Sequence, residues 1–275
     1  MKAEEVYVGI LRMEGTNCEQ EMYESFLRAG ATPELVHIKQ LEGKVSRPEE
    51  RRSLEDYHII MIPGGFSAGD YIRAGAIFAA RLKASLGNEL RRFVEEGRLI
   101  GGVCNGFQIL VELGLLPGIG DIMTEHPQAA LITNDSGVFE CRPTLVKHAG
   151  GGKSAFTHLI PPGEILQIPV AHAEGKFVVE SESILDEMLQ NEQVVFRYVN
   201  KEGSYAGYPW NPNGSLLSIA GIMNPTGNVF GMMPHPERVY FRYNHTTWPR
   251  EGLPTEEGDG AAIFRSAVEY VRRRF

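Results

Sequence analysis

Residues 99–110 read LIGGVCNGFQIL and decide the fold of this 275-residue chain. The apolar run at 99–103 predicts a buried β-strand, and the apolar residues at helical spacing after the cysteine predict a helix. Gly102 and Gly106 flank Cys104, so the backbone can reverse sharply at the cysteine without a side-chain clash. We therefore expect a strand, a tight turn and a helix, the unit from which α/β folds are built.

Cys104 in this turn is suited to nucleophilic chemistry. It would lie at the carboxyl end of a strand and at the start of a helix, where free N–H groups and the helix dipole stabilise a thiolate and can bind an oxyanion. This geometry is a nucleophile elbow with cysteine in place of serine. The same stretch fits a buried cysteine packed behind a glycine turn, because free cysteines are often buried. Both interpretations stay open on this stretch alone.

A second stretch, MMPHPE at 232–237, supplies the groups that a thiol nucleophile needs. His235 and Glu237 are two residues apart, so in an extended segment both side chains point to the same side. A nucleophilic thiol requires a base within hydrogen-bond reach, and the base requires a partner that orients it. Cys104, His235 and Glu237 can fill these three roles if the fold brings the two stretches together.

The composition argues against several other classes of function. The chain carries 27 basic and 35 acidic residues, a net charge of −8, so we expect no nucleic-acid partner. The N-terminus does not resemble a signal peptide, and no apolar run approaches the roughly 20 residues that span a membrane. Three cysteines without a CxxC pair predict neither a disulfide framework nor a metal site. We expect a cytoplasmic protein.

Apolar runs and turn signals divide the whole chain into alternating strands and helices. We expect one domain spanning residues 1–275, of the α/β class, with a mostly parallel central sheet flanked by helices. Alternating stretches in the second half predict antiparallel strands added to one side of this sheet. The expected strands are 6–11, 34–38, 58–62, 99–103, 130–132, 138–145, 164–170, 193–199, 216–222 and 228–232. The expected helices include 72–96, interrupted near 86–88, and 261–272.

The motif Gly102-x-Cys104-x-Gly106-x-Gln108, followed by HPE at 235–237, resembles the signature of class I, or triad, glutamine amidotransferases. Four further segments are similar to the glutaminase subunits of phosphoribosylformylglycinamidine synthase, an enzyme of de novo purine synthesis. They are RMEGTNC at 12–18, PGGFSAGD at 63–70, PVAHAEG at 169–175 and NPNGS at 211–215. The resemblance runs from about residue 6 to about residue 270 and implies a flavodoxin-like fold.

The resemblance implies a role for each part of the site. Cys104 would attack the side-chain amide of glutamine, His235 would move the proton and Glu237 would hold its ring. The backbone N–H groups of Gly65 and Asn105 would form an oxyanion hole. Substrate-binding residues would be Gln108, Asn213, Gly214 and Ser215.

Each of these secondary roles has a structural alternative. Gly65 fits a plain strand-to-helix turn, and Gln108 fits a hydrogen bond to a loop. The segment 213–215 fits a hairpin turn, since Asn-Gly is common there. His172 carries no readable role, and a packing histidine explains it equally well.

The sequence contains no GxxxxGK[ST] phosphate loop, so we expect this chain to bind no ATP in that way. The resemblance implies that the chain binds no cofactor. The ATP and Mg²⁺ of the overall reaction would be used by a separate synthetase subunit, PurL, which converts formylglycinamide ribonucleotide to the amidine. Its complex would usually include the small PurS protein, with ammonia passed internally.

The sequence leaves three alternative functions open. The chain could serve another amidotransferase, although PVAHAEG at 169–175 argues against this. It could be a cysteine peptidase or γ-glutamyl hydrolase on the same elbow, which would act without a partner. It could be a scaffold with an inactive site, which an intact triad disfavours. Stretches at 82–89 and 242–260 are longer than in short family members and leave partner contacts open.

Overall fold

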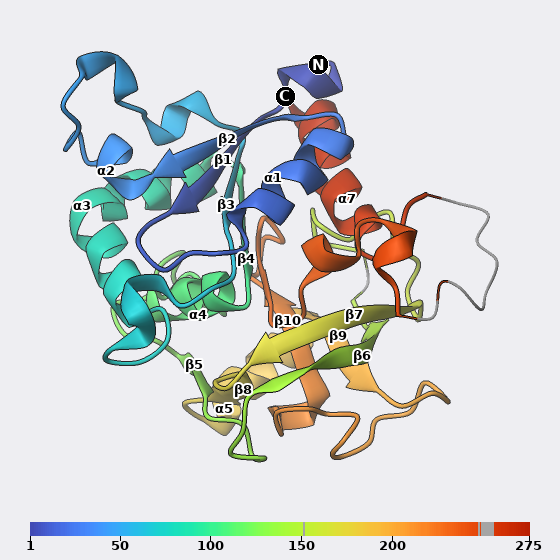
Figure 1. The fold of residues 1–275 in the computed structure, drawn as a ribbon. Coiled ribbons are helices and arrows are strands. Elements are labelled where there is room, and N and C mark those ends of the chain that lie inside the picture. The colour runs from blue at the N-terminus through green and yellow to red at the C-terminus, as the bar shows by residue number, and fades with distance from the viewer. Residues whose placement is uncertain (151, 247, 249–255) are drawn as a thin grey trace.

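The computed structural model describes residues 1–150, 152–246, 248 and 256–275. A nine-stranded sheet runs through the molecule in the order β2-β1-β3-β4-β11-β10-β9-β6-β7, and β5 pairs with β8 in a separate two-stranded sheet (Figure 1). The strands are β1 Tyr7–Arg12, β2 Thr32–His37, β3 Ile59–Ile62, β4 Leu99–Val103, β5 Ala129–Ile132, β6 Glu140–His148, β7 Ile165–His172, β8 Lys176–Val179, β9 Val194–Val199, β10 Ile219–Met223 and β11 Val229–Met232.

One half of the sheet is parallel and carries the site. Strands β2, β1, β3, β4 and β11 are parallel neighbours. β3, β4 and β11 are buried along their whole length, as expected for continuous apolar runs covered on both faces. Ile62 pairs with Gly102 and Met232 with Val103, so the three strands end at the same edge. Open α/β sheets bind ligands at this edge.

The other half is antiparallel, as the alternating stretches predicted. Strands β10, β9, β6 and β7 extend the sheet from β11. β7 alternates between buried and less buried residues along its length, which is the pattern of a strand with one covered face. The predicted fold class is therefore confirmed, with the antiparallel strands placed on one side of the parallel ones.

Helices cover both faces of the parallel half (Figure 1). α1 (Glu19–Arg28) and α7 (Ala261–Arg274) lie on one face, and α3 (Ala76–Glu95) and α4 (Asn105–Glu112) lie on the other. Two further helices are α2 (Ile38–Leu41) and α5 (Glu182–Gln190), and α5 lies beside β8. In the described parts of the chain, none of the helices has the length and apolar character needed to cross a membrane.

The predicted helix at 72–96 was wrong in two details. α3 begins at Ala76, because Gly75 before it has a left-handed backbone with φ 79°. α3 also continues unbroken through Gly87, where the sequence predicted an interruption. Glycine costs about 1 kcal/mol in a helix, and the buried apolar face of α3 outweighs this. The lengthened stretch at 82–89 thus lies inside α3, and residues 249–255 of the second stretch lie outside the described residues.

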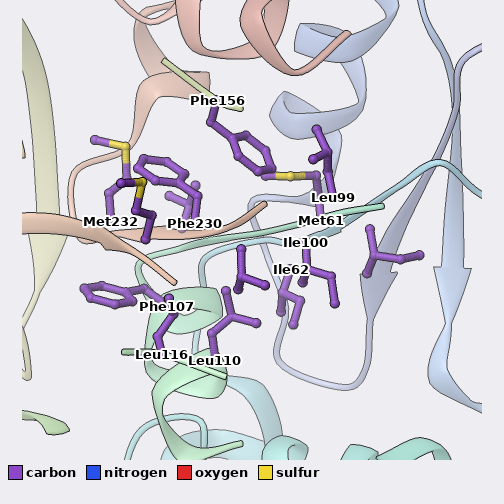
Figure 2. Packing of buried hydrophobic residues seen from close by; sticks show 14 of the residues in the cluster. Met61, Ile62, Leu99, Ile100, Phe107, Leu110, Leu116, Phe156, Phe230 and Met232 are labelled. Carbon is purple, nitrogen blue, oxygen red and sulfur yellow. The ribbon is translucent and has the colours of Figure 1, made fainter. Parts of the chain in front are cut away.

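Close packing around β4 fixes the position of the elbow. Figure 2 shows Phe107, Leu110 and Leu116 on the α4 side of the strand and Phe156 on the opposite side. A Cβ atom on Gly102 would lie 2.5 Å from the backbone of Gly106, so α4 approaches β4 more closely than a side chain would allow. The buried apolar residues of both halves of the sheet belong to one cluster.

Candidate active site

Cys104 occupies the turn between β4 and α4 in a strained conformation. Its φ and ψ are 52° and −108°, a combination that non-glycine residues rarely adopt. Its N–H donates to the carbonyl of Met232 at 2.8 Å, which ties the elbow to the end of β11. The thiol is almost fully buried and lies 3.6 Å from the carbonyl oxygen of Ala171 on β7. Strain of this kind is concentrated at functional sites because the surrounding structure must maintain it.

His235 and Glu237 form a buried pair next to this turn. His235 follows β11, and its N–H donates to the carbonyl of Pro169 on β7 at 2.8 Å. Glu237 lies in the short 3₁₀ helix η6 (Pro236–Val239), and its Oε1 is 2.6 Å from Nδ1 of His235. An ionised carboxylate only accepts hydrogen bonds, so Nδ1 carries the proton. Among the described residues, Nε2 of His235 has no hydrogen-bond partner, so it is available to another group.

The predicted catalytic residues come together at Gly64. A Cβ atom on Gly64 would lie 2.7 Å from Cε1 of His235 and 3.4 Å from Cβ of Cys104. Burial alone would lower the pKa of His235, but the Glu237 carboxylate and then the Cys104 sulfur raise it well above 6.5. The site therefore favours a protonated imidazole beside Cys104.

A cavity of ≈ 330 Å³ opens beside the cysteine. Its lining includes four predicted site residues and several that the sequence left without a role. They are Asn17, Cys18, Gly65, Phe66, Asp70, Ala74, Cys104, Gln108, Phe139, Cys141, Ala171, His172, Ala173, Glu174, His235 and Arg238. The volume suits a ligand of amino-acid size rather than a protein segment.

Of the two predicted oxyanion-hole residues, Gly65 lines the cavity together with Cys104, and Asn105 follows Cys104 in the chain. Gly65 bridges Thr16 through the hydrogen bonds of the flanking residues, Asn17 N–H to Gly64 and Phe66 N–H to Gly15. Thr16 and Gly65 are therefore a non-hydrogen-bonded pair of an antiparallel bridge, in which the N–H of Gly65 itself points away from Thr16. Asn105 is the first residue of α4, where N–H groups have no partner within the helix.

Gln108 both lines the cavity and braces its wall. Its Nε2 donates to the carbonyl of Glu174 at 2.5 Å, and its Oε1 accepts from Nδ2 of Asn105 at 3.0 Å. The side-chain polar groups are thus already hydrogen bonded within the protein. The loop contact predicted as a structural alternative is present, and a substrate contact stays a prediction.

Asn213, Gly214 and Ser215 do not line this cavity. Asn213 Nδ2 donates to the carbonyl of Gly175 at 2.8 Å, and Ser215 Oγ donates to the same oxygen at 3.3 Å. Gly214 lines a different pocket of ≈ 580 Å³. These residues lie behind residues 171–174, which line the cavity in their place. Their predicted substrate contact stays a prediction, and the geometry gives them a supporting position.

The structure adds two carboxylates that the sequence motifs contained without an assigned role. Asp70 ends the PGGFSAGD segment and Glu174 lies in PVAHAEG, and both line the cavity. Burial and the nearby charge of Glu174 raise the pKa of Asp70. Glu174 accepts the N–H of Ala74 at 3.2 Å. The two acidic groups make this end of the cavity suited to a cationic group of a ligand.

Cys18 also lines this cavity. Its Sγ is 3.9 Å from Nδ1 of His235 and accepts a hydrogen bond from Arg238 Nη2 at 3.2 Å. Donor atoms of Cys18, His235 and Glu237 lie within 4.8 Å of one another, close enough to hold a metal ion. An ion there would have to replace the His235–Glu237 hydrogen bond and lie beside the Arg238 guanidinium. The cluster therefore fits the orientation of the triad better than a cation.

This geometry is that of an enzyme with a thiol nucleophile, and comparison with known proteins defines its class. Residues 5–271 match the CobB/CobQ-like glutamine amidotransferase domain, so the chain belongs to the glutamine amidotransferases. It is 51% identical to the phosphoribosylformylglycinamidine synthase subunit PurQ of Archaeoglobus fulgidus, across 99% of this chain and 100% of that one.

Two further matches agree. The PurQ subunit of Picrophilus torridus is 49% identical across 93% of this chain and 95% of its own length. A chain in the structure of PurLQS from Thermotoga maritima is 32% identical with a TM-score of 0.72, across 98% of this chain and 100% of that chain. The chain belongs to the PurQ family.

Proposed function

We propose that this chain is the glutaminase subunit of a phosphoribosylformylglycinamidine synthase. It hydrolyses glutamine to glutamate and ammonia, and the ammonia is used to convert formylglycinamide ribonucleotide to the amidine. The observation that carries the proposal is the buried His235–Glu237 pair beside the strained Cys104, at the mouth of a cavity of ≈ 330 Å³, in a chain of the PurQ family.

In the proposed reaction, the Cys104 thiolate attacks the side-chain amide carbon of glutamine. The C–N bond breaks as imidazolium His235 gives its proton to the departing ammonia, which leaves a glutamyl thioester on the sulfur. Neutral His235 then takes a proton from water, whose oxygen attacks the thioester and releases glutamate. Glu237 keeps the ring oriented, with Nε2 toward the reacting atoms, through both steps.

Charge develops on the amide oxygen during both attacks. The N–H groups of Gly65 and Asn105 are suited to stabilise it, because both lie next to Cys104 and neither is used in the surrounding backbone contacts described above. Donors of this kind typically contribute about 10²–10³ in rate. This is the proposed role of Gly65, which has no reactive side chain.

The cavity also supports recognition of the amino-acid end of glutamine. Asp70 and Glu174 line it without an ion-pair partner among the described residues, and a substrate ammonium would supply one. A peptidase would need an open groove instead, so the cavity favours glutamine over the peptide substrate of the alternative hydrolases. Gln108 then braces the wall against which the substrate lies.

We infer that the ammonia passes to a PurL-type synthetase, which uses ATP and Mg²⁺, with PurS in the complex. The relatives support this, since one of them is part of a PurLQS structure. Exposed apolar residues beside the cavity, among them Tyr71 and Ile72, give the synthetase a surface to bind. We also infer a single domain at residues 1–275 and a cytoplasmic location, where the three free cysteines stay reduced.

Labelling with 6-diazo-5-oxo-norleucine tests the proposal, with the adduct located by mass spectrometry on the chain alone and with its synthetase. We expect one adduct, on Cys104, with faster labelling in the complex. Cys141→Ser serves as the control, because it removes an exposed cavity thiol without touching the triad. Failure to label Cys104 in both samples would overturn the mechanism, and hydrolysis of γ-glutamyl peptides by the chain alone would favour the rival hydrolase.

A further inference from the structure

One side of the cavity is formed by residues 171–175, the last two residues of β7 and its connection to β8, which are called the cavity wall below. The carbonyl of Ala171 lies 3.6 Å from the Cys104 sulfur, and the carbonyl of Glu174 accepts the hydrogen bond of Gln108. The wall therefore reaches from the nucleophile to the acidic end of the cavity. Its position decides how far a bound amide lies from Cys104.

Asn134, a buried residue between β5 and β6, holds this wall from behind. Its backbone N–H donates to the carbonyl of Ala173 at 2.9 Å. Its side-chain Nδ2 donates to the carbonyls of His172 at 2.9 Å and Val138 at 3.0 Å. Its Oδ1 accepts the N–H of Gly175 at 3.0 Å. Three of these hydrogen bonds reach three different residues of the wall, so Asn134 fixes its shape.

His172 completes the arrangement. Its Nδ1 lies 3.2 Å from Oδ1 of Asn134. The amide of Asn134 is oriented by its two Nδ2 hydrogen bonds, so Oδ1 faces the ring and can only accept. Nδ1 of His172 therefore carries the proton and Nε2 does not. The ring also packs against Gly175, where a Cβ atom would lie 2.5 Å from Nδ1.

The surroundings of His172 keep its ring neutral. Burial and the charge of His235 lower the pKa of His172 to about 4, while Glu140 on β6 acts in the opposite direction and Arg142 acts in the same direction. A ring that is neutral at pH 7 is a poor proton donor for the reaction. His172 is more useful as a fixed hydrogen-bond donor to the wall's support.

We propose that His172 and Asn134 are positioning residues that hold the cavity wall in register with Cys104, and that His172 acts through its Nδ1–H and not by proton transfer. The inference rests on the proposed glutaminase function. Asn213 and Ser215 assist at the far end, where both bind the carbonyl of Gly175. This gives a role to His172 and to the NPNGS segment at 211–215, whose side chains do not belong to the triad.

Two substitutions of His172 separate the ring's two nitrogens. His172→Asn keeps an N–H donor close to the position of Nδ1, whereas His172→Leu removes both nitrogens at similar size. We expect His172→Asn to keep the KM for glutamine within about threefold of wild type. We expect His172→Leu to raise the KM at least tenfold with a smaller change in kcat, because the wall loosens while the triad stays intact. His148→Leu is the matched control: His148 is an equally buried histidine at the other end of β6, and KM should not change.

Each outcome decides the proposal. Unchanged KM in folded His172→Leu, or equal losses in both variants, would overturn it, since the first removes any role and the second assigns the role to Nε2. Loss of the acid limb of the kcat/KM profile in His172→Asn would identify proton transfer instead and would also overturn it. If His172→Leu does not fold, Gly175→Ala is used instead, because its methyl group displaces the His172 ring. Gly207→Ala is its control, since no described atom lies within 4 Å of a Cβ there. An unchanged KM in Gly175→Ala would contradict the proposal. If wild type releases no ammonia from glutamine, the proposed function fails and not the role of the wall.

Discussion

Two opposing effects set the charge of His235. Enclosure in the protein disfavours a charged ring, whereas the Glu237 carboxylate at 2.6 Å and the Cys104 sulfur favour it, and the second effect is the larger. The same carboxylate that orients the ring therefore also keeps it protonated. A protonated His235 can stabilise the Cys104 thiolate before the substrate arrives.

Glu237→Gln separates these effects with little change in shape. The imidazolium loses its main stabilising charge, so the pKa of His235 falls. The alkaline limb of the kcat/KM profile, which follows loss of the imidazolium, should move to lower pH, and kcat should fall by about 10²–10⁴. Ammonia release measured across pH checks both. Glu187→Gln, an exposed substitution on α5, should leave the profile unchanged, and an unmoved alkaline limb in Glu237→Gln would show that the carboxylate does not set the charge.

At the scale of single residues, the sequence predicted the triad because two motifs carry it in full. It did not predict the positions of Asp70, Glu174 and Arg238, since their relation to Cys104 depends on how loops from distant strands meet. The substrate contact of residues 213–215 stays a prediction, while the side chains of Asn213 and Ser215 hydrogen bond to the wall. A hydrogen bond from one loop to the back of another leaves no pattern in a single sequence.

Among the structural elements, α4 packs closely on the sheet. Gly106 in its first turn lies directly against the carbonyl of Ile62 at the end of β3, and a Cβ atom on Gly106 would overlap that oxygen. The glycine therefore serves the packing of the helix on β3 as well as the turn at Cys104. By contrast, Gly87 in α3 has only the tip of Met123 within 4.0 Å.

Gly106→Ala and Gly87→Ala should accordingly have opposite effects on the free energy of unfolding. We expect Gly106→Ala to lower it by about 3 kcal/mol or more, because a backbone carbonyl cannot yield as a flexible side chain can. Gly87→Ala should raise it by about 0.5–1 kcal/mol, because alanine favours a helix over glycine where space is free. Urea unfolding of the two variants checks the pair, and a stable Gly106→Ala protein would contradict the packing argument.

The predictability of the elements follows the same logic. Continuous apolar runs predicted the parallel strands and alternating runs predicted antiparallel ones, since burial on one or two faces leaves a period in the sequence, but the short strand β8 was not predicted. The start of α3 was placed too early because residues 72–75 look apolar enough for a helix. Their backbone instead follows a loop with left-handed residues at Ala68 and Asp70, which no periodicity reveals.

On the scale of the whole molecule, the face with the cavity differs from an ordinary surface. Tyr71 is 89% exposed and Ile72 is 73% exposed. They lie on the loop between Asp70 and Ala74, and it is Asp70 and Ala74 that line the cavity. Phe66 and Phe139 line the cavity and are also exposed. Exposed apolar groups gathered around a catalytic opening are typical of a binding surface. A glutaminase that must deliver ammonia to a partner has reason to place its docking surface there.

The double substitution Tyr71→Ser, Ile72→Ser should therefore weaken the complex with the synthetase and spare the isolated enzyme. Neither residue lines the cavity, so ammonia release by the chain alone should stay within about twofold of wild type. Removing two exposed apolar contacts should raise the Kd for the synthetase at least about tenfold, equivalent to about 1.4 kcal/mol. Titration calorimetry measures the Kd, and glutamine-dependent synthesis of the amidine measures the coupling. Leu189→Ser removes an exposed apolar side chain from α5 and should change neither quantity. If the double variant bound the synthetase as tightly as wild type, the docking surface would have to lie elsewhere, and ammonia would have to leave the cavity by another side.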